Sequence, residues 1–280
     1  MRPLDNKVIV YDSNCKVCSS WKDIVISLTR IPESKVKAYK DLSDGLDTKV
    51  DLAKFQNAMA LVDTNGGPTL YGTEGIAYIF SSQFGIAAAL FKFRPALRMF
   101  DFLYKTQAYN RYIIATPKSK FMCDCFPDRI VKYRISYIVI CVIISLMLTA
   151  LLGVSLKSFA GVSLAASVAQ MLLIAGTGWV LQILLAIVIL KEKALDYIAH
   201  LGSIMVTGLL VLIPWILLHW IAGVKSYYIP IISVTISSTL MLYLHIHRVR
   251  HLQLSQAWTI SWFLFLQATA VAWIYTFYIQ

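Results

Sequence analysis

The chain has 280 residues, of which 58% are hydrophobic and only 15% are charged, and its mean hydropathy is +0.65. An ordinary soluble domain is about 45–50% apolar and about 25% charged. The composition therefore excludes a purely soluble enzyme and a disordered chain, and five cysteines are too few for a disulfide-rich secreted scaffold. The net charge of +11 comes without any nucleic-acid-binding motif, so we expect no nucleic acid among the partners.

Charge is distributed unevenly along the chain. Residues 1–134 hold 20 of the 26 Lys and Arg residues and 13 of the 15 Asp and Glu residues. We therefore predict a soluble domain at 1–128, whose last part forms amphipathic helices, and a membrane domain at 129–280. The first residues contain no apolar signal-peptide core, so we expect the N-terminal domain to stay in the cytoplasm.

The first predicted element is a strand at 7–11, whose sequence is apolar and rich in β-branched residues. Turn and N-cap residues follow at 12–14. A helix comes next, because apolar side chains at Val17, Trp21, Ile24, Val25 and Leu28 share one helical face. Pro32 ends this helix.

The rest of the soluble domain alternates strands and helices. We predict a strand at 36–39, a short helix at 49–55, a hairpin of strands 58–62 and 68–71, and a helix at 74–84. The order β-α-β-(α)-β-β-α is typical of a thioredoxin-like α/β fold. The stretch 86–112 interleaves aromatic and basic residues, which suits either a helix at an anionic membrane surface or a helix packed on the domain's own core.

Cys15 and Cys18 stand where the first predicted strand meets the first helix. Residues three apart share a helical face, so the two sulfurs can form a disulfide without backbone strain. The first thiol also faces the free N–H groups at the helix N-terminus, which favour the nucleophilic thiolate. We predict Cys15 as a reachable nucleophile, Cys18 as the resolving thiol, and Lys16 and Lys22 as the nearby positive charges.

Other interpretations of the Cys-Lys-Val-Cys motif stay open. Cys123 and Cys125 could complete a four-thiolate zinc site with it, or act as a second dithiol, or be free thiols. The pair at 15 and 18 could also be two unrelated buried cysteines, or the remnant of a fold that has lost its redox role. Asp12 could tune the thiols or cap the helix.

The run Tyr-Asp-Ser-Asn-Cys-Lys-Val-Cys at 11–18 resembles the Tyr-Asp-Gly-x-Cys-x-x-Cys signature of the DCC (Asp-Cys-Cys) family of thiol–disulfide oxidoreductases. The runs 70–77, 95–97 and 104–112 are similar to later segments of that family, in the same order. The resemblance implies a thioredoxin-like fold and functional roles for Asp12, Cys15 and Cys18. Ser13 stands where the family usually has glycine, and the proline that precedes the third strand in thioredoxins is not found.

The C-terminal half contains five charge-poor windows, each longer than the ~20 residues that a membrane-spanning helix needs. We predict spans near 135–156, 164–190, 197–221, 227–247 and 257–279. Loops richer in Lys and Arg alternate with poorer ones, which predicts a multi-pass protein, in a bacterial inner membrane, with a cytoplasmic N-terminal domain and an external C-terminus. His200, His245 and His247 could bind a metal or haem, but we favour polar positions at the membrane interface.

The function we predict from these features is a membrane-anchored thiol–disulfide oxidoreductase that acts on the cytoplasmic side. Its partners would be a protein or small-molecule disulfide or thiol and the lipid bilayer, and the reaction implies neither a cofactor nor a metal. The alternatives are a non-enzymatic membrane scaffold whose thioredoxin-like domain is a binding module, and a zinc-stabilised membrane protein.

Overall fold

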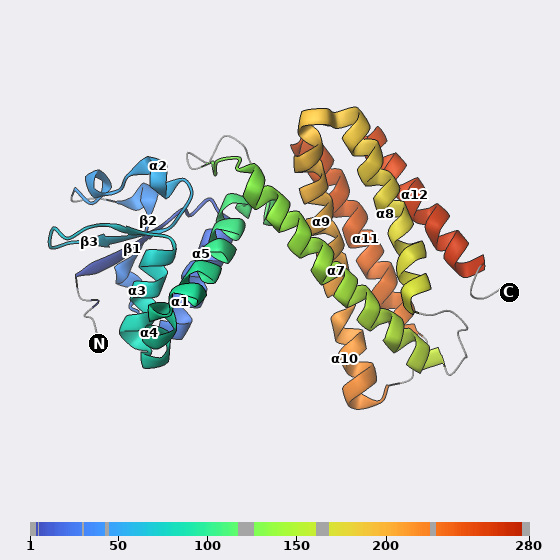
Figure 1. The fold of residues 1–280 in the computed structure, drawn as a ribbon, viewed down its shortest axis with the longest axis horizontal. Coiled ribbons are helices and arrows are strands. Elements are labelled where there is room, and N and C mark those ends of the chain that lie inside the picture. Colours follow the sequence, from blue (N-terminus) through green and yellow to red (C-terminus); the bar gives the residue numbers. More distant parts are fainter. Residues whose placement is uncertain are drawn as a thin grey trace. The chain divides into compact units, whose positions relative to one another are not determined.

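The structure is a computed structural model, and it describes residues 4, 6–29, 31–42, 45–116, 126–160, 168–224 and 228–275. The chain divides into two compact units, Met1–Arg134 and Ile135–Gln280. The described residues are mainly helical, and a small mixed sheet lies in the first unit (Figure 1).

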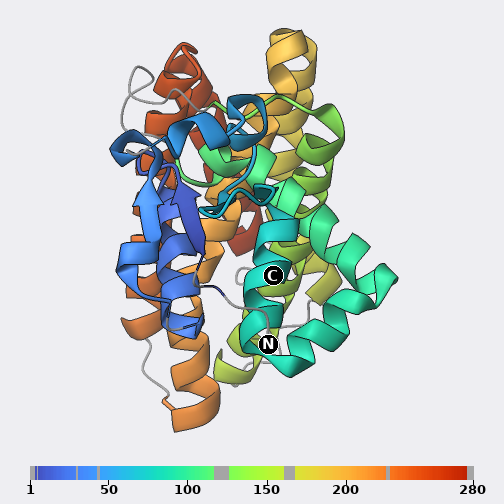
Figure 2. The ribbon, with the colours of Figure 1, turned by 90° about the vertical axis from the view of Figure 1, so that its left-hand side faces the viewer.

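Four strands form the sheet in the order β2-β1-β3-β4. They are β1 (Lys7–Tyr11), β2 (Val36–Ala38), β3 (Ala60–Asp63) and β4 (Leu70–Tyr71). β2 runs parallel to β1, as Figure 2 shows, while β3 is antiparallel to both β1 and β4. Ile9 lies opposite Val36 on one side and opposite Leu61 on the other. The parallel pair requires a crossover, and the first helix supplies it.

The helices of the first unit follow the predicted order as far as residue 84. They are α1 (Lys16–Thr29), α2 (Leu52–Phe55), α3 (Thr73–Gln83), α4 (Gly85–Lys92), α5 (Arg94–Tyr109) and α6 (Arg111–Ile114). Short 3-10 helices occupy 33–35, 39–41 and 47–49. The amphipathic stretch after residue 84 forms three helices. Phe93 is extended and Pro95 lies in the first turn of α5, which separates α4 from α5, and Asn110 separates α5 from α6.

Alternating residues of the central strands supply two separate cores. On one face of the sheet, Ile9 and Leu61 pack with Val25 of α1 and Ile79 of α3. On the other face, Val8, Val10, Ala60 and Val62 pack with Phe55 of α2, which is 1% exposed. The period-two alternation of β1 and β3 therefore buries both faces of the sheet, and α1 is fixed by its contacts with the first of these cores.

The second unit is a bundle of helices. They are α7 (Val131–Ala160, which begins in the first unit), α8 (Val168–Leu190), α9 (Ala194–Leu210), α10 (Ile213–Ala222), α11 (Tyr228–His251) and α12 (Ala257–Ile274), with a 3-10 helix at 191–193. α8 packs along α12 and α9 along α11, as Figure 1 shows. Among the described residues, the stretches 131–155, 172–222 and 228–251 are long and apolar enough to cross a membrane, and 257–272 is a shorter apolar helix.

One predicted span is not a single helix. The window 197–221 contains the end of α9 at Leu210 and the start of α10 at Ile213. Pro214 lies in the first turn of α10, where its ring would clash with the carbonyl of Leu210 in a continuous helix and where it has no N–H to donate. The chain therefore breaks its helical hydrogen bonding inside this apolar segment.

Candidate functional site

A tight turn connects β1 to α1 and positions the two cysteines. The Asp12 carboxylate accepts a hydrogen bond from the Asn14 N–H at 2.9 Å, and the Cys15 N–H donates to the Asp12 carbonyl at 3.3 Å. This is the turn that aspartate favours by bonding the backbone two residues later. Cys15 therefore precedes the first residue of α1, and Cys18 lies in its first turn. Asp12 organises the turn and is not the N-cap of the helix.

The sulfur of Cys15 accepts a hydrogen bond from the Cys18 N–H at 3.4 Å. The pKa of Cys15 is lowered to about 7, mainly because the Cys18 thiol donates a hydrogen bond to its sulfur, and further because of the Cys18 backbone N–H and the charge of Arg111. Burial and the Asp12 carboxylate oppose this shift. The pKa of Cys18 is raised, mainly by that same hydrogen bond to Cys15 and by burial. The two thiols are therefore unequal, and Cys15 is the one that ionises near neutral pH.

Arg111 is the cation of the site. Its Nη2 lies 3.7 Å from Oδ2 of Asp12, and the two side chains are 2% and 7% exposed. The guanidinium also lies over the Tyr112 ring, 5.4 Å from its centre. The sequence predicted Lys16 and Lys22 as nearby positive charges; in the structure Lys22 pairs with Asp23 at 2.9 Å and Lys16 is exposed to solvent, and the positive charge that lowers the pKa of Cys15 is that of Arg111. The only sequence signal for Arg111 is the run at 104–112, which carries part of the family resemblance.

Access to the thiols differs from the expectation. Cys15 is 1% exposed and Cys18 is 6% exposed, so both are buried instead of reachable at the helix tip. Tyr112, with Ile114 and Ala115 beside it, packs on them and on Val17. The Tyr112 hydroxyl donates a hydrogen bond to the Asp12 carboxylate at 3.5 Å. The centres of the Tyr112 and Phe126 rings lie 4.9 Å apart, with the two rings in a T-shaped arrangement. We call Tyr112, Ile114 and Ala115 the α6 cover.

Hydrogen bonds of the residues just before α6 help to hold the α6 cover in place. Asn110, just before α6, donates to the Tyr133 carbonyl at 3.0 Å and accepts from Arg134 at 2.8 Å. On the preceding helix, Gln107 accepts a hydrogen bond from the Trp21 indole N–H at 2.7 Å. These contacts tie the α6 cover to α1 and to the first turns of α7.

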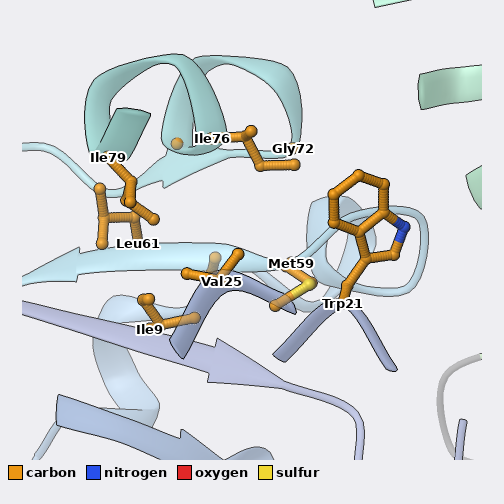
Figure 3. A pocket seen from close by; sticks show the side chains of 10 residues that line it. Ile9, Trp21, Val25, Met59, Leu61, Gly72, Ile76 and Ile79 are labelled. Atoms are coloured by element: carbon orange, nitrogen blue, oxygen red, sulfur yellow. The ribbon is translucent and has the colours of Figure 1, made fainter. Parts of the chain in front are cut away.

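Two small cavities lie beside α1, and one of them reaches the dithiol. One, of about 20 Å³, is lined by Cys18, Trp21, Met59, Gln107 and Arg111 among others. A second, of similar volume, lies between α1, α3 and the sheet and is lined by apolar side chains that include Trp21 and Met59 (Figure 3). A cavity of about this size holds one water molecule. Neither of these two cavities therefore has room for a larger molecule.

The other candidate residues do not join this site. Cys123 and Cys125 lie outside the described residues. His200 and His245 are buried in the helix bundle, 4% and 1% exposed, so their side chains do not reach water as we had expected, whereas His247 is exposed. No group of three or more His, Cys, Asp or Glu side chains within the described ranges could hold a metal.

The buried histidines bond to polar residues of the bundle. His245 Nε2 lies 3.0 Å from the Tyr197 hydroxyl, its Nδ1 lies 3.1 Å from Thr259 Oγ1, and its ring stacks on Trp262. His200 Nδ1 lies 2.8 Å from a guanidinium nitrogen of Arg248. Such pairing is what a buried polar group needs in an apolar environment, and it links the helices of the second unit.

No protein-family model matches this chain, and no curated protein or solved structure matches it either. The candidate site is therefore supported by its geometry and by the motif at 11–18 alone.

The rate at which iodoacetamide alkylates Cys15 should rise with pH through a midpoint near 7. Replacing Arg111 by Met should raise this midpoint by roughly one pH unit, because a positive charge that favours the thiolate is lost; replacing Asp12 by Asn should lower it. Mass spectrometry of the Cys15 peptide measures the rate. Lys22→Met is the matched control and should leave the midpoint unchanged. A midpoint near 9 in the unmodified protein would contradict the assignment.

Replacing Tyr112 by Ala should increase the alkylation rate of Cys15 on the order of tenfold at every pH, because local opening is no longer needed to reach the sulfur. The midpoint should move little, since Arg111 stays in place. The control is Phe126→Ala, which removes a ring that packs against Tyr112 and is itself 44% exposed. Equal rates in the two variants would show that Tyr112 does not limit access.

Proposed function

We propose that this protein is a membrane-anchored thiol–disulfide oxidoreductase of the DCC type, with Cys15 as nucleophile and Cys18 as resolving thiol. The observation that carries the proposal is the position of the Cys15 sulfur at the start of α1, in contact with the Cys18 N–H and with a pKa lowered to about 7. A thiol that is partly ionised at neutral pH and has a second thiol one turn away is suited to exchange with disulfides.

The fold of the first unit supports this proposal. A sheet of order β2-β1-β3-β4, with β1 and β2 parallel and β3 and β4 antiparallel, is the arrangement of a thioredoxin-like domain, and the dithiol follows β1 as it does there. Met59 precedes β3, at the place where thioredoxins have proline. Ser13 lies in the turn without positive φ, so the loop does not need the glycine of the family motif.

Reduction of a substrate disulfide by this dithiol takes two exchange steps. The Cys15 thiolate attacks one sulfur of a substrate disulfide; a bond forms between Cys15 and that sulfur, the substrate S–S bond breaks, and the other substrate sulfur leaves as a thiolate. Cys18 then loses its proton to water and attacks the Cys15 sulfur. The Cys15–Cys18 disulfide forms and the second substrate thiolate leaves. The substrate gains two electrons and the dithiol is oxidised by two, to be regenerated by an external dithiol or thiol.

The unequal pKa values favour this order of events. The pKa of Cys18 is raised mainly by its hydrogen bond to Cys15, and the Cys15 charge adds to the effect. The hydrogen bond and the Cys15 charge are both lost once Cys15 carries a substrate sulfur, whereas burial still raises the pKa of Cys18 and Arg111 still lowers it. Formation of the mixed disulfide therefore makes Cys18 more acidic at the moment when it must act.

We propose five crossings, in which α9 and α10 together make one broken span and α12 makes the last, with the first unit in the cytoplasm. The alternation of basic loops in the sequence supports this topology. The cytoplasm is reducing, so the resting form there is the dithiol, which is the form that the structure holds.

A second candidate function is a membrane scaffold whose first unit binds a partner without redox chemistry. The burial of both sulfurs beneath the α6 cover favours it. The two functions differ in whether the dithiol exchanges electrons with a glutathione buffer. A third candidate is a membrane protein stabilised by zinc that is bound to Cys15, Cys18, Cys123 and Cys125. Metal analysis tests it, because the purified protein would have to contain zinc and the Cys123→Ser variant would have to lose it.

Replacing Cys18 by Ser in the full-length protein should trap a mixed disulfide between Cys15 and its substrate, because the resolving thiol is missing. Non-reducing electrophoresis and mass spectrometry after an oxidant pulse in cells would identify the adduct. Cys15→Ser is the matched control and should trap nothing.

The outcome for the scaffold is also specific. If Cys18→Ser captures no adduct, and if the unmodified protein shows no dithiol–disulfide transition in a glutathione titration, the oxidoreductase proposal is wrong.

A further inference from the structure

The corner between α4 and α5 exposes an unusual number of large apolar side chains. No residue of α4 is buried. Ile86 and Leu90 are 87% and 54% exposed, and their spacing of four residues places them on one side of α4. Phe93, which follows the helix, is 62% exposed. Met99 of α5 is 63% exposed. Exposed apolar groups gathered in this way mark an interaction surface and not an ordinary soluble face.

The aromatic residues of this stretch have two different roles. Phe91 and Phe100 pair with each other at 5.3 Å where α4 meets α5, and Tyr104 is buried against α3. These rings hold the corner to the domain. The apolar side chains on the outside take no part in that packing, so they are available to a partner.

Basic side chains surround the exposed apolar ones. Lys92, Arg94 and Arg98 are all exposed, and none forms an ion pair with a described residue. The acidic residue of α5, Asp101, is bound to Lys105 at 2.7 Å and to the Thr73 hydroxyl. The corner therefore presents three uncompensated positive charges next to apolar side chains.

We propose that this α4–α5 corner, made of Ile86, Leu90, Lys92, Phe93, Arg94, Arg98 and Met99, binds the surface of an anionic lipid bilayer. The apolar side chains enter the boundary between headgroups and acyl chains, while the three cations contact anionic headgroups. The same chain contains helices that are long and apolar enough to cross a membrane, so a bilayer is a partner that the rest of the chain also fits. A second copy of this corner is a poorer partner, because self-association would bring like charges together.

Hydrogen exchange of the full chain in lipid nanodiscs tests the proposal. In discs of phosphatidylcholine with phosphatidylglycerol, amides of residues 84–99 should exchange at least about tenfold more slowly than in phosphatidylcholine alone, since the corner has three basic residues and each contributes about a fivefold change in binding to an anionic surface. The difference should shrink at high salt. It should disappear when Arg94 and Arg98 are both replaced by Glu.

The matched control changes the same charge elsewhere in the first unit. Lys37→Glu with Lys40→Glu should leave the lipid-dependent difference intact. Unchanged exchange in β1 and β3 would show that each variant is folded. Equal exchange of residues 84–99 in the two lipids would overturn the proposal, as would protection that depends on protein concentration and not on lipid charge, which would indicate a second copy.

Discussion

The buried ion pair between Arg111 and Asp12 is the interaction on which the site depends. It joins the start of α6 to the turn that precedes α1, and both side chains are almost fully enclosed. A buried carboxylate or guanidinium without its partner would be strongly destabilising, so the pair fixes α6 against the dithiol loop. It also places one positive and one negative charge beside the two sulfurs. Arg111 lowers the pKa values of Cys15 and Cys18, whereas Asp12 raises them.

Reactivity and access are therefore controlled by the same short segment. Arg111 favours the thiolate, and the next residue, Tyr112, covers it. A partner that displaces Tyr112 without moving Arg111 would expose an activated sulfur. Because Asn110 bonds to the backbone and side chain of the first residues of α7, movement of this segment requires those bonds to break or to move with it. An enclosed, ionisable thiol of this kind is protected from random oxidation until it is uncovered.

The two units place polar groups by different rules. In the first, charged residues cover an α/β core and cluster at the dithiol and at the α4–α5 corner. In the second, several polar side chains lie inside the bundle and bond to one another, as His245, Tyr197 and Gln182 do. An apolar environment offers a polar group no water, so neighbouring helices must supply its partners. This explains why histidines that the sequence suggests for an interface are buried.

Local pattern was enough to predict much of this protein. An apolar run rich in β-branched residues predicted β1, and helical periodicity predicted α1. The position of Cys15 and Cys18 at the strand–helix junction followed from these, because each signal acts over a few neighbouring residues. The role of Arg111, the burial of the thiols and the break at Pro214 were decided only by tertiary structure. The bond from Tyr112 to Asp12 joins residues 100 positions apart, and no periodicity encodes such a contact. Pro214 lies inside an uninterrupted apolar window, and the length of that window predicted a single span. Only the structure shows that the helix breaks just before this proline.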